Sequence, residues 1–195
     1  MAVKQRLSRG EYLCGAFLSI RSAELAEIIA QAGFDFIIID SEHCSYDWSE
    51  IEQLIKVISY NRVSPIVRVP GIFRPLILRT LDLGAEGILV PRVDSAREAQ
   101  DVVRFAKYPP LGDRGFAGIV RSAKYGKLPV REYIEQANEN ILLAVQAETA
   151  KAVDNLGEIA SVRGIDLVFV GPSDLSVSLG FAGRPNASEV QEKIE

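Results

Sequence analysis

The chain contains 195 residues, 48% of them hydrophobic and 25% charged, and carries a formal net charge of −4 at pH 7. These proportions are typical of one folded domain with an apolar core. The sequence has no long basic run and no apolar stretch of roughly 18 residues, which argues against a nucleic-acid partner and against a membrane span. The two cysteines, Cys14 and Cys44, lack metal-type spacing, which predicts reduced thiols in a cytoplasmic protein.

Short, nearly continuous apolar runs recur along the chain and predict β-strands that are covered on both faces. These runs are Ala16–Ile20, Phe34–Ile39, Pro65–Val69, Gly87–Val90, Ile141–Val145 and Ile165–Val170. Apolar residues at helical spacing predict the helices between them, which are Ala23–Ala32, Ser49–Ser59, Pro75–Leu83, Ser95–Ala106 and Thr149–Val162. The alternation of strand and helix predicts βαβ crossovers and a parallel sheet.

Three helix-to-strand junctions carry a glycine where the helix is expected to end. Gly33, Gly84 and Gly164 each stand two or three residues before the next strand. Glycine suits the left-handed residue that follows a helix, so these junctions predict tight connections.

Six strand–helix units can be counted, which predicts either an open α/β sheet or a barrel whose last quarter is absent. The whole chain is expected to form one domain. The segment from residue 107 to 128 contains proline and glycine and is too long for an ordinary connection, so we expect a functional loop or lid there.

Polar residues cluster where the predicted strands end. In parallel α/β folds, the carboxyl ends of the strands and the loops that follow them carry the chemistry. The residues at these positions are Asp40, Glu42 and His43 after the second strand, Arg68 in the third, Gln146 and Glu148 after the fifth, and Ser173 and Asp174 after the sixth.

Glu148 and Asp174 end consecutive strands, and paired strands lie about 4.8 Å apart. Two carboxylates at such a short distance repel each other, and this repulsion is costly unless a cation lies between them or one of them is protonated. An all-oxygen pair suits a hard divalent ion, Mg²⁺ or Mn²⁺. Gln146 projects from the same side of its strand as Glu148 and is expected to bind substrate beside the ion.

Structural explanations exist for each residue taken alone. Glu148 and Asp174 could cap the helices that follow them, and His43 could be a hydrogen-bonded structural histidine. Arg68 is harder to explain this way, because an unpaired guanidinium in a buried strand is expensive. A Cys44–His43 nucleophile pair is disfavoured because adjacent side chains diverge, and no G-x-S-x-G, Walker or G-x-G-x-x-G motif is present.

Six ordered motifs resemble the HpcH/HpaI aldolase family, the class II metal-dependent pyruvate aldolases typified by 2,4-dihydroxyhept-2-ene-1,7-dioate aldolase. They are "IIIDSEHCSYD", "PIVRVPG", "LDLGAEGILVPRVDSAREA", "PPLGDRG", "AVQAET" and "FVGPSDLSVSLG". The resemblance implies a (β/α)₈ TIM barrel, usually hexameric, that cleaves a 4-hydroxy-2-oxoacid to pyruvate and an aldehyde. It also implies a divalent metal, Mg²⁺ or Mn²⁺ with Co²⁺ as a further candidate.

The resemblance implies a role for each matching residue. By position, Glu148 and Asp174 would bind the metal, His43 would be the base and Arg68 would stabilise charge on the pyruvate oxygen. The remaining matches are Gln146 and the backbone of Ser173 as substrate-binding positions, Asp82 as the residue that raises the basicity of the histidine, and Asp40 and Glu42 as the outer shell around metal-bound water.

Asp82 precedes the glycine that ends a helix, which places it at the floor of a barrel, far from His43. A carboxylate at a helix C-terminus is also disfavoured by the helix dipole. We therefore hypothesise that Asp82 reaches His43 of another copy across a subunit interface.

Two departures from the family pattern shape the expectation. Ser41 stands where many members have glycine, which predicts an altered aldehyde pocket. The last two barrel strands of the family have no counterpart, so the sequence is expected to form a barrel truncated after about six units.

Two alternative functions stay open: a related lyase or decarboxylase of an oxaloacetate-like acid, and an inactive fragment with a role in assembly. A simple metal- or anion-binding module would leave Arg68 and His43 without a function.

Overall fold

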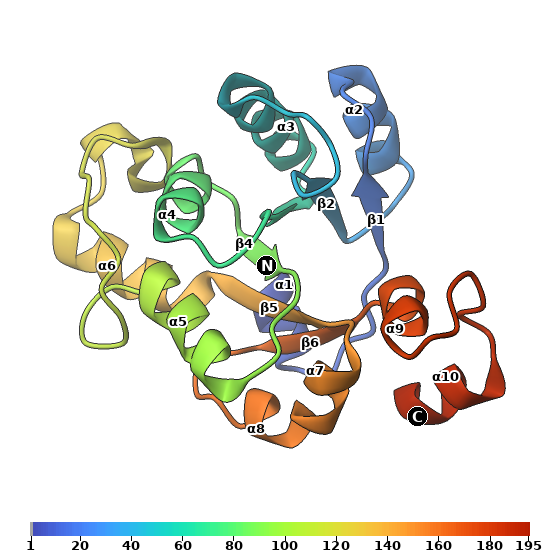
Figure 1. Ribbon diagram of the computed structural model, residues 1–195. Helices are drawn as coiled ribbons and strands as arrows, with labels where there is room; N and C mark the ends of the chain where they lie inside the picture. The colour runs from blue at the N-terminus through green and yellow to red at the C-terminus, as the bar shows by residue number, and fades with distance from the viewer. Residues whose placement is uncertain (1) are drawn as a thin grey trace.

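The computed structural model describes residues 2–195, which form one curved parallel β-sheet with helices packed against its outer face (Figure 1). Each strand pairs with the next one in the chain, so the order across the sheet is β1-β2-β3-β4-β5-β6. The strands are β1 (Gly15–Leu18), β2 (Phe36–Asp40), β3 (Ser64–Arg68), β4 (Gly87–Val90), β5 (Leu142–Ala147) and β6 (Leu167–Val170).

Helices fill most of the segments between the strands. They are α1 (Val3–Leu7), α2 (Ala23–Gln31), α3 (Trp48–Tyr60), α4 (Arg74–Asp82), α5 (Ala96–Ala106), the 3₁₀ helix η1 (Arg121–Gly126), α6 (Val130–Asn140), α7 (Ala150–Asp154), α8 (Leu156–Ala160), α9 (Pro172–Ser178) and α10 (Ser188–Ile194). Within residues 2–195, no helix combines the length and the apolar composition required to span a membrane.

Successive residues of each strand point to opposite faces of the sheet, and both faces are apolar. On the outer face, Ile37 and Ile39 of β2 belong to the main core, together with Ile55 of α3. On the inner face, Ile38 and its counterparts in the neighbouring strands form a second cluster, against which Val3 of α1 packs. Apolar residues on both faces explain why the strands are continuous apolar runs in the sequence.

The expectation of an eight-unit TIM barrel is wrong for this chain. The described residues form six parallel strands, with β1 and β6 at the two edges of the sheet and unpaired with each other. The sheet curls far enough for Phe17 of β1 and Phe169 of β6 to meet edge-to-face, with ring centroids 5.9 Å apart. The sequence itself contains only six strand-forming runs, and the expectation of eight units rested on the family resemblance. The observed fold is therefore an α/β half-barrel.

All six predicted strands are present, with ends shifted by up to two residues. The predicted junction glycines are also confirmed, since Gly33, Gly84 and Gly164 have φ values of 95°, 95° and 108°. Gly84 has a second reason to be glycine, because a Cβ there would lie 2.3 Å from Nη1 of Arg121. That Arg121 nitrogen donates a hydrogen bond to the Leu83 carbonyl at the end of α4.

The helices differ from the prediction at several places, and α1, η1, α9 and α10 have no predicted counterpart. The expected helix from Thr149 to Val162 is divided into α7 and α8 at Asn155, whose side-chain amide donates to the Asp94 carbonyl at 2.8 Å. This contact with a distant loop holds Asn155 where the helix breaks. Helix α6 was not predicted, because only Tyr133 and Ala137 of its residues are buried and its apolar stripe is correspondingly narrow.

The segment from residue 107 to 128 contains η1 and lies beside the C-terminal end of α4 (Figure 1). Its Arg114 side chain is fully buried and forms an ion pair with Asp82 at 2.7 Å. Because helices of this fold run antiparallel to the strands, the end of α4 lies at the amino-terminal edge of the sheet. The role of this segment as a lid stays a prediction.

Alanine substitutions at three glycines separate the cost of a left-handed backbone from the cost of moving Arg121. Gly33→Ala meets nothing within 4 Å, so it should lose about 1–2 kcal/mol from its φ of 95° alone. Gly84→Ala should lose about 1 kcal/mol more, because it displaces the Arg121 hydrogen bond. Gly157→Ala, in α8 with open space around it, should be neutral or stabilising. Urea denaturation measures all three, and equal losses at Gly84 and Gly33 would contradict a contribution from Arg121.

Candidate active site

The candidate site lies along the carboxyl edge of the sheet, where β2, β3, β5 and β6 end close together. Asp40 and Arg68 are the last residues of β2 and β3 and are register partners. Gln146 lies near the end of β5, where it pairs with Phe169 of β6. Parallel pairing therefore brings residues from four separate segments of the chain to one edge, as the sequence predicts.

Asp40 and Arg68 form a bidentate ion pair. The Arg68 Nε and Nη2 atoms donate to the two Asp40 carboxylate oxygens at 2.9 and 2.8 Å. Burial acts to raise the pKa of Asp40, but the hydrogen bonds and charge of Arg68 outweigh it and lower the pKa below its usual value. Asp40 also accepts hydrogen bonds from the backbone amides of Glu42 and His43, so it fixes the loop that carries both residues.

The loop after β2 places Glu42 and His43 beside this ion pair. Glu42 Oε2 lies 3.3 Å from Arg68 Nη1 and 3.7 Å from His43 Nε2. Burial raises the pKa of Glu42, and the negative charges of Asp40 and Asp174 act in the same direction. The His43 side chain is 63% exposed, so it is not a histidine buried in the core and remains open to a substrate.

Two further contacts fix Arg68. The Phe17 ring lies under the guanidinium, with 5.0 Å between Cζ and the ring centroid, an arrangement that favours a cation. On the backbone, the Ser41 hydroxyl donates to the Arg68 carbonyl at 2.6 Å. Ser41 therefore ties the His43 loop to β3.

Glu148 is buried immediately after β5 and is held in place by the backbone. Its Oε1 atom accepts a hydrogen bond from the amide of Arg92 at 2.9 Å, and its Oε2 atom accepts one from the Gln146 side-chain amide. Burial raises the pKa of Glu148, and Asp174 and Glu42 raise it further. Gly171 makes room for this arrangement, because a Cβ there would lie 2.9 Å from the Glu148 carboxylate and the Gln146 amide.

Asp174 and Ser173 lie in the first turn of α9 and are exposed. Asp174 is near enough for its charge to raise the pKa values of Glu42 and Glu148. Neither acidic residue caps a helix: Thr149 provides the cap of α7, and α9 has no side-chain cap. The capping explanation of these two residues is therefore wrong.

The arrangement fits a divalent cation. Glu42, Glu148 and Asp174 repel one another, and the buried atoms Glu42 Oε2 and Gln146 Oε1 have no hydrogen-bond partner. Within residues 2–195, no three histidine, cysteine or acidic side chains form a ready-made ligand group. Two carboxylates that leave coordination positions free for other oxygen ligands match a catalytic ion better than a structural one.

Asp82 is the one predicted site residue that lies elsewhere. It ends α4 at the amino-terminal edge of the sheet, whereas His43 follows the carboxyl end of β2. Burial raises the pKa of Asp82, opposed by its ion pair with Arg114, which also offsets the unfavourable helix dipole. Within one chain, Asp82 and His43 are therefore not brought together.

Sequence reasoning missed three residues that shape the site. The Phe17 ring contacts Arg68, the Arg92 amide binds Glu148, and Gly171 admits the Glu148 carboxylate. Arg92 and Gly171 lie within the motifs quoted above and come just after β4 and β6. Their positions at strand ends could therefore have identified them as site residues. Phe17 belongs to an apolar run and looks like an ordinary core residue.

Comparison with known proteins is consistent with this geometry. A model of the HpcH/HpaI aldolase/citrate lyase family matches residues 13–195. The 2-keto-3-deoxy-L-rhamnonate aldolase of Escherichia coli (strain K12) is 40% identical over 193 residues, which cover 98% of this chain and 72% of the relative. The chain belongs to the HpcH/HpaI aldolase/citrate lyase family, and it is an enzyme of the aldolase, or carbon–carbon lyase, type.

Solved structures agree with this assignment. The HpcH/HpaI aldolase from Desulfitobacterium hafniense DCB-2 is 38% identical and superimposes with a TM-score of 0.92, covering 99% of this chain and 74% of that one. The citrate synthase SbnG is 32% identical with a TM-score of 0.91, at the same coverage of 99% and 74%. The half-barrel therefore matches most, but not all, of the fold of these relatives.

Neutralising Glu148 should separate stability from cation binding. Because burial and neighbouring carboxylates raise the pKa of Glu148, its ionisation destabilises the metal-free fold as the pH rises through that pKa. Glu148→Gln should therefore raise the urea midpoint of metal-free protein at pH 7 and remove the stabilisation by Mn²⁺ seen in the unmodified protein. Glu158→Gln, on the exposed side of α8, is the matched control and should change neither. Mn²⁺ stabilisation that survives Glu148→Gln would contradict the assignment of this ligand.

Proposed function

We propose that the protein catalyses the reversible aldol cleavage of a 4-hydroxy-2-oxoacid to pyruvate and an aldehyde. The observation that carries the proposal is the largely buried Arg68 guanidinium, held by Asp40 next to carboxylates whose pKa values are raised. A fixed positive charge beside a cation site is what a developing enolate requires. Family membership and the rhamnonate-aldolase relative support the same reaction class.

The ion we propose is Mg²⁺ or Mn²⁺, with Co²⁺ as a further candidate, because the donors are oxygen atoms. Glu148 and Asp174 would hold it, and Asp40 and Glu42 would order the water around it. When bound, such an ion acts as a Lewis acid that stabilises negative charge on the 2-oxoacid. The Gln146 side chain and the Ser173 backbone would orient the substrate's carboxylate and keto groups.

His43 is the proposed base. It would remove the proton from the 4-hydroxyl group. The C3–C4 bond then breaks, the aldehyde leaves, and the electron pair of the broken bond stays with C3 as part of a pyruvate enolate. Arg68 would stabilise the negative oxygen of that enolate, and protonation at C3 would complete pyruvate. The exposure of His43 next to the largely buried Glu42 and Arg68 supports this division between a proton carrier and fixed charges.

Asp82 is proposed to act on His43 of another copy of the chain. Asp82 lies at the edge of the sheet opposite the site, so it cannot reach His43 of its own chain. A contact between subunits would allow its carboxylate to polarise His43 of another copy. We therefore propose a homo-oligomer, a hexamer by family resemblance, in the cytoplasm, with residues 1–195 as one domain.

A related reaction on an oxaloacetate-like acid is the second candidate. The citrate synthase SbnG shares 32% identity with this chain, and its name implies carbon–carbon bond formation on a similar acid. Decarboxylation of an oxaloacetate-like acid would break the bond to its terminal carboxylate, release carbon dioxide and leave a pyruvate enolate, so the same guanidinium and cation site would serve. The leaving group, an aldehyde or carbon dioxide, distinguishes the two reactions.

Exchange of the pyruvate methyl protons tests the proposed function without knowledge of the aldehyde. In D₂O with Mn²⁺, the protein should replace these protons by deuterium, because enolate formation at the site is reversible. Proton NMR of pyruvate measures the rate, and removal of the metal with EDTA should stop the exchange. Acetate, which has no 2-oxo group, is the control substrate. Absence of exchange by metal-loaded, folded protein would contradict the aldolase proposal.

Mixed oligomers test whether Asp82 and His43 act together across subunits. Each of His43→Ala and Asp82→Asn should lower kcat about 10²-fold or more, as expected for loss of general base catalysis. His43→Ala should leave Mn²⁺ affinity unchanged. Co-expression of the two variants should restore part of the activity, since some sites then combine an intact His43 with an intact Asp82. Activity no greater than the sum of the two variants would rule out the intersubunit arrangement.

A further inference from the structure

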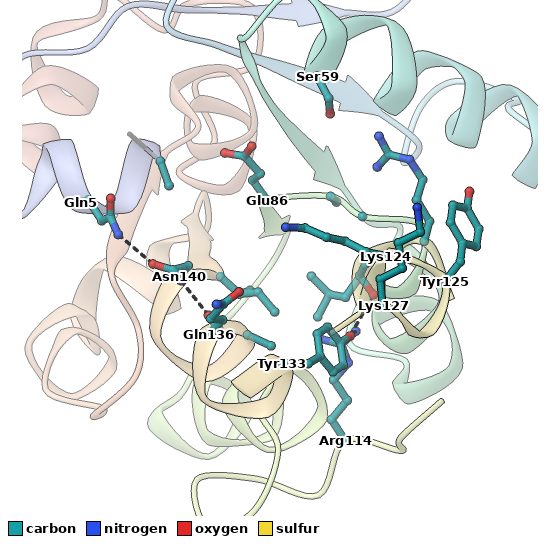
Figure 2. Close-up of a pocket in the computed structure, with 18 residues that line it drawn as sticks. Gln5, Ser59, Glu86, Arg114, Lys124, Tyr125, Lys127, Tyr133, Gln136 and Asn140 are labelled. Carbon is teal, nitrogen blue, oxygen red and sulfur yellow. Dashed lines mark hydrogen bonds between the residues drawn. The ribbon is translucent and has the colours of Figure 1, made fainter. Parts of the chain in front are cut away.

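A cavity of about 790 Å³ lies at the amino-terminal edge of the sheet, at the opposite end from the candidate active site. Figure 2 shows the side chains that line it. Its walls are the end of α4, the 3₁₀ helix η1 and one face of α6. Glu86, which precedes β4, and Ile141, which precedes β5, place it at the start of the strands. A volume of this size accommodates a small metabolite.

The lining of this cavity is strongly basic. Four of its side chains are cationic, namely Arg114, Arg121, Lys124 and Lys127, against the single carboxylate of Glu86. Glu86 is already engaged, since its Oε2 atom accepts from the Ser64 hydroxyl at 2.6 Å. Among residues 2–195, no acidic side chain lies within ion-pair distance of Lys124 or Lys127. Arg114 is paired with Asp82, but the charges of Lys124 and Lys127 are not neutralised within the described chain.

Arg114 is the deepest of these cations and is incompletely satisfied. Its side chain is fully buried, and Nη2 donates to Asp82 at 2.7 Å and to the Tyr133 hydroxyl at 3.4 Å. The Nε and Nη1 atoms are buried without a hydrogen-bond partner. The Tyr108 ring lies 4.7 Å from the guanidinium carbon, but it contacts the face of the group and leaves its edge donors unused. Buried donors of a charged group are costly to leave unpaired.

The two lysines are presented by a strained piece of backbone. Lys124 and Tyr125 both adopt left-handed conformations, with φ values of 50° and 54°, although neither is glycine. Each such residue costs of order 1 kcal/mol or more, a cost found most often at functional sites. Figure 2 shows that Lys124, Tyr125 and Lys127 come from this one segment, on the side of the cavity opposite Gln136 and Asn140 of α6.

We propose that this cavity binds a small metabolite through a dianionic group, a phosphate or a pair of carboxylates. The anion would sit between Lys124 and Lys127 in the cavity that Arg114 also lines. Ammonium and guanidinium groups both bind phosphate and carboxylate oxygens. Within one chain, this site lies at the opposite end of the strands from the edge where Arg68 would meet the 2-oxoacid. Its test measures anion binding and not the proposed reaction, so the two proposals can fail separately.

Titration calorimetry with inorganic phosphate and with succinate tests the site at low ionic strength, where screening is weakest. Saturable binding of at least one anion is expected, and the preferred probe tells whether the ligand is a phosphate or a dicarboxylate. The double variant Lys124→Gln/Lys127→Gln should bind that anion about tenfold more weakly, because two charges that face it are lost. It keeps Arg114, so the core is not disturbed, and thermal melting checks that the fold is unchanged.

The matched control is the double variant Lys56→Gln/Lys193→Gln, which removes two half-exposed lysines elsewhere on the surface. It should bind the anion as the unmodified protein does. Equal weakening in both double variants would mean a general effect of net charge and would overturn the proposal. Unchanged binding in the Lys124/Lys127 variant, or no saturable binding of either anion, would overturn it as well.

Discussion

The ion pair between Asp40 and Arg68 is the contact on which the geometry of the candidate site depends. It joins the ends of two neighbouring strands by two charge-assisted hydrogen bonds and has little access to water. The same Asp40 carboxylate accepts the backbone amides of Glu42 and His43. One side chain therefore orients both the guanidinium and the loop that carries the histidine. Loss of Arg68 would leave the buried Asp40 carboxylate without its ion-pair partner, at a cost of about 3–5 kcal/mol.

Around this pair the fold accumulates negative charge that it does not neutralise. Glu42, Glu148 and Asp174 come from three separate segments, and burial together with mutual repulsion raises the pKa values of Glu42 and Glu148. A protein gains nothing in stability from such an arrangement, which explains why strain of this kind is concentrated at functional sites. A bound cation would relieve this repulsion next to two buried oxygens, Glu42 Oε2 and Gln146 Oε1, that have no hydrogen-bond partner.

Some features could be predicted because they depend on local sequence. These are the strands and most of the helices, the glycines at helix-to-strand junctions, and the polar residues at strand ends. The features that could not be predicted depend on contacts between distant segments. Asn155 breaks a helix because it binds the Asp94 carbonyl 61 residues away. Arg114 is buried because it meets Asp82, 32 residues away. Likewise, no local pattern indicates that six strands curl into a half-barrel or that Phe17 lies under Arg68.

The central claim is that Glu148 and Asp174 share one divalent cation next to Arg68. Crystals grown with MnCl₂ and pyruvate, measured at the manganese absorption edge, test it most directly. The account predicts one anomalous peak that is bonded to a carboxylate oxygen of each residue. A peak elsewhere, or a carboxyl edge that stays empty of manganese at saturating concentration, would contradict it.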